Sequence, residues 1–219
     1  MKNGFGNSKG QSPTLNPRAK PLKRPTQARA IFTVDAIYEA FVRIWLRDGW
    51  PGLTTREVAL EAGVAIGTLY DYFPCKEALL SGYIRHWLDV LLRAMDENVV
   101  QANDLDWSTR IKRLIRLTCN PDDASQPLFN HAVLLIEHLI AEPKHHRRFF
   151  DELTQKWREA FAACSDLPAQ PSQTALDAWV IMAWGGRRYC VAAQPAAVQT
   201  AAWLSEMETI ICGRLASIV

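Results

Sequence analysis

The stretch GVAIGTLYDYFPCKEAL, residues 63–79, gathers two tyrosines, a phenylalanine, a threonine and a lysine around one tight turn. Hydroxyl and ammonium groups can donate hydrogen bonds to phosphate oxygens. A small or apolar side chain can approach a thymine methyl group or a crowded base edge. The stretch is too short to fold alone, so its chemistry depends on neighbouring helices that hold it in place.

The first of these helices is predicted from apolar spacing. Apolar residues recur at three- and four-residue intervals from Ile31 to Trp45, which is typical of one face of an amphipathic helix. Gly49 stands where a helix C-cap belongs, and Pro51 opposes continuation. We therefore expect this helix to end near Gly49.

Two shorter helices are predicted next. Thr54 is followed three residues later by Glu57, a capping-box pattern that predicts a helix over 55–62. Gly63 ends it, and a third helix is expected over 65–72. Two short helices joined by a glycine-containing turn form a helix-turn-helix, which places its second helix in the DNA major groove.

The N-terminal stretch 1–26 is rich in Gly, Pro, Ser, Asn and Lys, and we expect it to be disordered until bound. The first 34 residues carry seven Lys or Arg and no acidic residue. The whole chain has a net charge of +2, which leaves −5 for the rest. A basic arm on a mildly acidic body indicates a polyanionic partner, and a solvated tail that only aids solubility is the alternative.

The run from about residue 29 to residue 80 resembles the DNA-binding domain of TetR-type transcriptional regulators. The segments that carry the resemblance are TVDAI, Gly49, LTTREVA, EAGV, GTLYDYFP and KEALL. The resemblance implies that Leu69 and Phe73 pack the small core. It implies DNA contacts at Thr55, Arg56, Ile66, Gly67, Thr68, Tyr70, Tyr72 and Lys76.

Two positions depart from the pattern of the family. Ala65 stands where relatives often have a serine that caps the recognition helix, so this cap is weaker by about 1 kcal/mol. Cys75 stands where relatives often have serine or asparagine. Neither change removes an expected DNA contact.

The rest of the chain also reads as helical, with no convincing strand, internal repeat or Gly-rich phosphate loop. We expect an all-α fold: a three-helix DNA-binding bundle over 27–80 after the arm 1–26, and a larger helical domain over 81–219. The further helices are expected from Lys76 to about Asn103, after Asp106, and over 128–141, 143–164, 172–193 and 196–217.

The resemblance implies that the domain 81–219 binds a small-molecule effector of unknown identity and forms a homodimer through about 172–217. Gly185 and Gly186 lie inside a predicted helix, where a close crossing at the dimer interface and a plain kink are both open explanations. Core packing is the alternative for each aromatic ligand candidate. The candidate ligand residues are Trp87, Trp107, His131, His138, Trp157 and Trp179.

Several classes of site and location are disfavoured by composition. The five cysteines are dispersed without ligand spacing, and residues 144–148 read as a solvated basic patch, so no metal and no cofactor is expected. No apolar run reaches the ~18–20 residues that span a bilayer. No apolar signal core is found at the N-terminus, and we expect a cytoplasmic protein without membrane contact.

Together these features predict a homodimeric regulator that binds double-stranded DNA at a near-palindromic operator. Repression relieved by a small molecule is the favoured reading, and an activator or a ligand-independent regulator of the same fold is the alternative. An enzyme built on a helical bundle is a remote alternative, because we find no nucleophile motif or paired metal ligands and therefore assign no catalytic residue.

Overall fold

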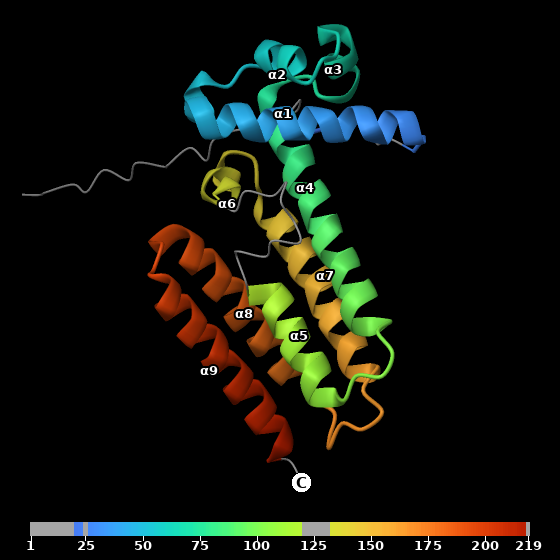
Figure 1. Ribbon diagram of the computed structural model, residues 1–219, viewed down its shortest axis with the longest axis vertical. Coiled ribbons are helices and arrows are strands. Elements are labelled where there is room, and N and C mark those ends of the chain that lie inside the picture. The colour runs from blue at the N-terminus through green and yellow to red at the C-terminus, as the bar shows by residue number, and fades with distance from the viewer. Residues whose placement is uncertain (1–19, 24–25, 120–131, 218–219) are drawn as a thin grey trace, which may run out of the picture.

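The computed structural model describes residues 20–23, 26–119 and 132–217, and every regular element in these ranges is helical (Figure 1). This confirms the all-α class. Most of the arm, residues 1–19 and 24–25, lies outside the described residues. The elements are α1 (Ala28–Gly52), α2 (Thr55–Glu61), α3 (Ile66–Tyr72), α4 (Lys76–Met95), the π-helical turn η1 (Asp96–Val100), α5 (Trp107–Cys119), α6 (Val133–Ile136), the 3-10 turn η2 (Glu137–Leu139), α7 (Pro143–Ala162), α8 (Gln173–Ala193) and α9 (Ala197–Ala216).

The first helix bends where its end was predicted. Gly49 has φ +69° and ψ 178°, a backbone conformation that favours glycine, and the chain turns there before one last helical turn reaches Gly52. Pro51 sits inside that last turn. The kink lets the chain leave α1 and enter α2 within a few residues.

The helices α1, α2, α3 and the first half of α4 form a small head around one core. In Figure 1, α2 and α3 lie on the side of α1 that faces away from the rest of the molecule. Residues of α6 and α8, with Ile140 after η2, extend this core from below. The buried residues of the head core include Ile37, Phe41, Ile44, Val58, Leu69, Phe73, Leu79, Leu80, Leu134 and Val191.

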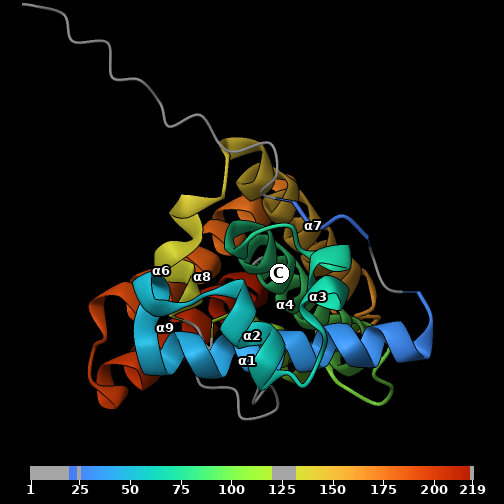
Figure 2. The same cartoon turned by 90° about the horizontal axis from the view of Figure 1, so that it is seen from above.

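The second half of α4 and the helices α5 and α7 to α9 form a larger body around a second core. Figure 1 shows α8 and α9 side by side along one flank, and Figure 2 shows α1 lying across the end of the bundle. The fully buried aromatic rings come mainly from α7. The buried residues of the body core include Trp87, Leu91, Met95, Ile111, Leu114, Leu153, Trp157, Phe161, Trp179 and Ile211.

The long buried helix expected over 128–141 is wrong for the part that the structure describes. There the chain forms the four-residue α6, and Ile136 then leaves helical geometry at φ −106° and ψ 2° before a 3-10 turn. A nearly continuous apolar run has no helical period, so it predicts burial but not helix length. Residues 128–131 lie outside the described residues.

Gly186 has a packing role within this chain. A Cβ atom built at Gly186 would lie 2.3 Å from Cζ2 of Trp203, so α8 can approach α9 this closely only with glycine at that position. A Cβ at Gly185 would meet nothing within 4 Å. Of the two glycines, Gly186 is thus explained by the α8–α9 contact, and Gly185 remains exposed on the outer side of α8.

These two glycines predict opposite effects of the same substitution. Gly186→Ala should lower the free energy of unfolding by about 1–3 kcal/mol because the methyl group overpacks against Trp203. Gly185→Ala should leave it unchanged or raise it by up to about 1 kcal/mol through helix propensity. Urea unfolding at one fixed protein concentration measures both, and equal effects would contradict the packing role of Gly186.

Candidate nucleic-acid interface

The turn between α2 and α3 is built as the sequence predicts. The Thr54 hydroxyl accepts a hydrogen bond from the Glu57 backbone N–H at 3.2 Å and donates one to Glu57 Oε2 at 2.9 Å. Gly63 has φ +67°, a conformation that glycine adopts without strain. The Thr54 N-cap is therefore confirmed, whereas Glu57 bonds the Thr54 hydroxyl rather than the Thr54 backbone N–H of a full capping box.

Helix α3 buries one side and presents the other. Leu69 and Phe73 are almost wholly buried, whereas Ile66 is 40% exposed and Tyr70 is 46% exposed. Gly67 is also exposed, and a Cβ there would meet no atom within 4 Å. No side chain caps the helix at Ala65, which agrees with the expected weak cap.

The hydroxyl groups of Thr55 and Tyr70 lie 3.2 Å apart, so the start of α2 and the middle of α3 meet at one edge. Arg56 is exposed in the first turn of α2, and Thr68 is half-buried in the first turn of α3. The structure thus gathers Thr55, Arg56 and Tyr70 with the outer side of α3. A DNA contact for each of them stays a prediction.

Lys76 has partners inside the chain. Its Nζ donates to the backbone carbonyl of Trp50 at 3.1 Å and lies 3.5 Å from that of Leu53, and it also stands 4.7 Å from the centre of the Trp50 ring. The ammonium group therefore holds the corner between α1 and α2. A contact between Lys76, in this position, and a DNA phosphate stays a prediction.

Tyr72 ends α3 and is tied to the segment before α1. The backbone N–H of Leu22 donates to the Tyr72 carbonyl at 2.7 Å. Pro21, next to Leu22, packs against α4 where Gly82 leaves room for it: a Cβ at Gly82 would lie 3.0 Å from Pro21 Cγ. The side chain of Tyr72 is half-buried.

Three of the tryptophans predicted to hold a ligand lie in or beside the body core. Trp157 is fully buried, and its indole N–H donates to the Thr118 hydroxyl at 3.1 Å. Trp179 stacks on Phe161 with ring centres 5.9 Å apart. Trp107 is half-buried at the start of α5. These contacts are core packing, the alternative considered for each of them.

The other predicted ligand residues are scattered. Trp87 stacks on Trp184 at 5.9 Å. His138 is exposed, with a ring nitrogen 2.9 Å from the Leu135 carbonyl oxygen. His131 lies outside the described residues. The structure does not bring the described members of the predicted set together, and a ligand contact for them stays a prediction.

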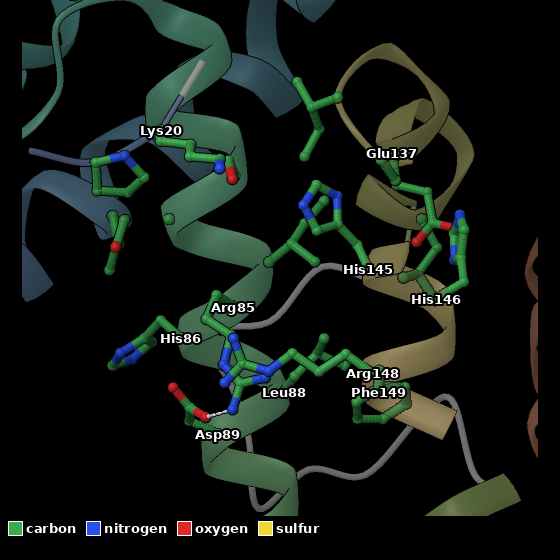
Figure 3. Close-up of a pocket in the computed structure, with 18 of the residues that line it drawn as sticks. Lys20, Arg85, His86, Leu88, Asp89, Glu137, His145, His146, Arg148 and Phe149 are labelled. Atoms are coloured by element: carbon green, nitrogen blue, oxygen red, sulfur yellow. Dashed lines mark hydrogen bonds and ion pairs between the residues drawn. The ribbon is translucent and has the colours of Figure 1, made fainter. Parts of the chain in front are cut away.

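A cavity of about 1250 Å³ opens elsewhere, between the segment 20–23, α1, α4, the α6–η2 turn, α7 and α8. Figure 3 shows its two main walls: Arg85, His86, Leu88 and Asp89 come from α4, and His145, His146, Arg148 and Phe149 come from α7. None of the described residues of the predicted ligand set lines it. Trp184 does line it, and Trp87 packs behind that ring.

Residues 144–148 are mostly exposed, as the interpretation of them as a solvated basic patch predicts, and only His145 is half-buried. His145, His146 and Arg148 line the cavity. Arg148 and Arg85, from facing helices, both donate to Glu152, at 2.8 Å and 2.7 Å. Only the helical spacing of His145, His146 and Arg148 could have indicated that they line the same cavity, because charged side chains are ordinarily expected in solvent.

Burial changes the titration of two cavity histidines. Burial lowers the pKa of His86 below its ordinary value, although Asp35 opposes this. Burial also lowers the pKa of His145, with Glu142 opposing. Both imidazoles are therefore neutral at pH 7, and each can donate a hydrogen bond without carrying charge.

Within residues 20–23, 26–119 and 132–217, no group of three or more His, Cys, Asp or Glu side chains is placed to hold a metal ion. No helix of the described chain is long and apolar enough to cross a membrane.

The head also matches a known family. Residues 37–82, from α1 to the start of α4, match the profile of the family described as "Bacterial regulatory proteins, tetR family". The head is thus similar to the regulatory domain of this family over residues 37–82. The family is one of transcriptional regulators.

Known relatives extend the likeness beyond the head. The chain is 28% identical over 116 residues to the HTH-type transcriptional repressor KstR2 of Rhodococcus jostii (strain RHA1), a match that spans 53% of this chain and about half, 55%, of that repressor. A transcriptional regulator of Rhodococcus sp. Rha1 superposes with a TM-score of 0.59 at 17% identity, over 83% of this chain and 95% of its own. The fatty acid degradation regulator FadR of Bacillus halodurans gives 0.58 at 17% identity, over 87% and 97%. At this identity the two solved structures show the fold.

Because Lys76 holds the corner between α1 and α2, removing its charge should destabilise the chain more than removing the charge of an exposed residue. Lys76→Met should lower the free energy of unfolding by about 1.5–3 kcal/mol, because two carbonyl groups lose a charged donor. Arg56→Met removes the same charge from an exposed position and should stay within about 0.5 kcal/mol of the parent. Thermal or urea unfolding distinguishes them, and equal stability of the two variants would contradict the structural role of Lys76.

Proposed function

We propose that this chain is a homodimeric TetR-type repressor that inserts α3 into the DNA major groove at a near-palindromic operator. A small-molecule effector favours a conformation in which the two heads no longer fit successive major grooves. The effector shifts operator occupancy only as far as its affinities for the two conformations differ. One recognition helix reads few base pairs, so two heads spaced by about one DNA turn, roughly 34–36 Å, are required.

The outer side of α3 is the observation that carries this proposal. Gly67 lies in the first turn of α3, where glycine costs up to about 1 kcal/mol relative to alanine, and no atom of the described chain would contact a Cβ there. The packing of the chain therefore gives no reason for a glycine. A base edge or sugar–phosphate backbone that approaches α3 closely does, and Ile66 and Tyr70 flank it with an apolar and a hydroxyl group.

A second observation supports the homodimer. The outer side of α8 consists of exposed residues that carry no charge: Ala178, Ile181, Met182, Gly185, Tyr189 and Ala192. Ile181 is 60% exposed and Tyr189 is 70% exposed. The neighbouring outer side of α9 is also largely small or apolar and includes exposed Val198 and Ile210. A largely apolar surface on two long helices, interrupted on α9 by exposed Glu206 and Arg214, is suited to an isologous interface with a second copy.

The sign of regulation comes from the relative. The Rhodococcus jostii protein is named a repressor, and repression is proposed here on that likeness. An activator or a ligand-independent regulator would use the same head and the same dimer surface. The name of the Bacillus halodurans regulator refers to fatty acid degradation, and at 17% identity that role is not carried over.

Selection of bound sequences from a random pool of double-stranded DNA, with purified full-length protein at moderate salt, tests the DNA-binding proposal. We expect a near-palindrome. Gly67→Ala should then weaken binding to it by at least tenfold, because its methyl group occupies the contact surface, while the free energy of unfolding is unchanged or slightly raised. Absence of any enriched sequence from folded protein would overturn the proposal, and unchanged affinity of Gly67→Ala would remove α3 from the interface.

The dimer surface yields a separate prediction. Ile181→Glu places a charge in the proposed interface and should shift sedimentation equilibrium from dimer toward monomer by at least tenfold in the dissociation constant. Leu60→Glu is the matched control, since Leu60 is 81% exposed on α2 in the head. Both variants should keep the helical circular dichroism spectrum. A dimer that withstands Ile181→Glu would place the interface elsewhere.

A further inference from the structure

The cavity between head and body has an apolar floor. Leu88 on α4, Phe149 on α7 and Trp184 on α8 line it, and Phe149 and Trp184 are in ring contact at 4.8 Å. Leu134 and Ile140 add apolar surface from the α6–η2 side. An apolar group that displaces water from this floor gains free energy in proportion to the area covered.

The rim of the cavity is charged, and positive charge is in excess. Six Lys or Arg side chains and four Asp or Glu side chains line it. Three of the acidic residues have arginine or lysine partners, and the fourth faces a histidine at 3.9 Å. The four pairs are Asp89 with Arg85, Glu137 with Arg188, Glu142 with Lys144 and Asp35 with His86.

The excess comes from Lys20, Lys23 and Arg93. No carboxylate of the described chain lies within 4.0 Å of their charged nitrogens, whereas Arg85 and Arg148 share Glu152. Lys20 and Lys23 belong to the segment whose Leu22 is hydrogen-bonded to Tyr72 of the head, and Figure 3 shows Lys20 on the same side as α4. The charge of Lys20 reaches the opposite wall: after burial, it is among the charges that lower the pKa of His145 on α7.

We infer that this cavity binds a small amphipathic anion, whose apolar part lies on the floor formed by Leu88, Phe149 and Trp184 and whose acidic group is held by Lys20 and Lys23. A cationic ligand would meet a rim with surplus positive charge. A purely apolar ligand would leave the two lysines without a partner beside it. This inference rests on the proposed function, because it names the chemical class and the site of the effector.

The position of the two lysines connects such a ligand to the recognition helix. Leu22 lies between them, and its N–H donates to the carbonyl of Tyr72 at the end of α3. Pro21 packs in the same segment against α4 at Gly82. An anion held by Lys20 and Lys23 therefore acts on a segment that contacts both α3 and α4. Its binding can differ between head orientations, as an effector requires.

Two dyes with the same aromatic body test the charge requirement. The probe 8-anilinonaphthalene-1-sulfonate carries a sulfonate, and N-phenyl-1-naphthylamine lacks it. Fluorescence titration of the full-length protein should show tighter binding of the sulfonate. The double variant Lys20→Gln/Lys23→Gln should weaken sulfonate binding at least fivefold and change binding of the neutral dye less than twofold. Ser81→Trp, which fills the cavity from α4, should weaken both dyes.

The matched control removes two positive charges outside the cavity. Lys112→Gln/Arg147→Gln changes exposed residues of α5 and α7 that do not line it, and sulfonate affinity should stay within twofold. Equal weakening in both double variants would overturn the inference in favour of general charge attraction. Equal weakening of both dyes by the lysine variant would overturn it too, as would unchanged binding in Ser81→Trp. All variants are compared at unchanged circular dichroism.

DNA selection on the same protein separates this inference from the proposed function. If an operator is selected but the dyes do not discriminate, the cavity inference fails and the repressor proposal stands. If the dyes behave as expected but no DNA sequence is enriched, the cavity site stands as an anion site and the proposed function fails.

Discussion

The arrangement of the molecule depends on helix α4, which runs from one hydrophobic core into the other. The N-terminal half of α4 places Leu80 and Tyr83 in the head core, and its C-terminal half places Trp87 and Leu91 in the body core. A continuous helix of about 30 Å moves as one rigid unit, so a tilt of its N-terminal half also moves its C-terminal half. The head therefore cannot rotate unless α4 moves within the body, and the cavity lies along the face of α4 where such a movement would be felt.

Local signals in the sequence were enough to predict the head. The spacing of apolar residues from Ile31 onward, the N-cap at Thr54 and the glycine at 63 each act over a few residues, and all three appear in the structure. The partners of Lys76 could not be predicted this way. Its ammonium group bonds carbonyls 23 and 26 residues earlier in the chain, and that proximity exists only after α1 kinks at Gly49.

The cavity was missed because its walls come from charged residues on helices far apart in sequence. Arg85 and Arg148 meet across Glu152, although 63 positions separate them, and a single-sequence pattern assigns such side chains to solvent. For the aromatic residues the sequence pattern leaves two roles open. Trp157 and Trp179 follow the helical period, and that period reports which face is buried without distinguishing a packed core from a ligand surface.

The contact between Gly186 and Trp203 has a geometric consequence for the two-fold dimer that we propose through α8 and α9. It sets how closely these helices approach and thus the angle at which each body leaves the symmetry axis. Two-fold symmetry applies the same change of angle to the partner. Because each head is separated from the interface by the length of the body, a small change of angle becomes a larger displacement of the heads. A methyl group near the axis thus has the leverage to alter the span between two recognition helices at the far end of the molecule.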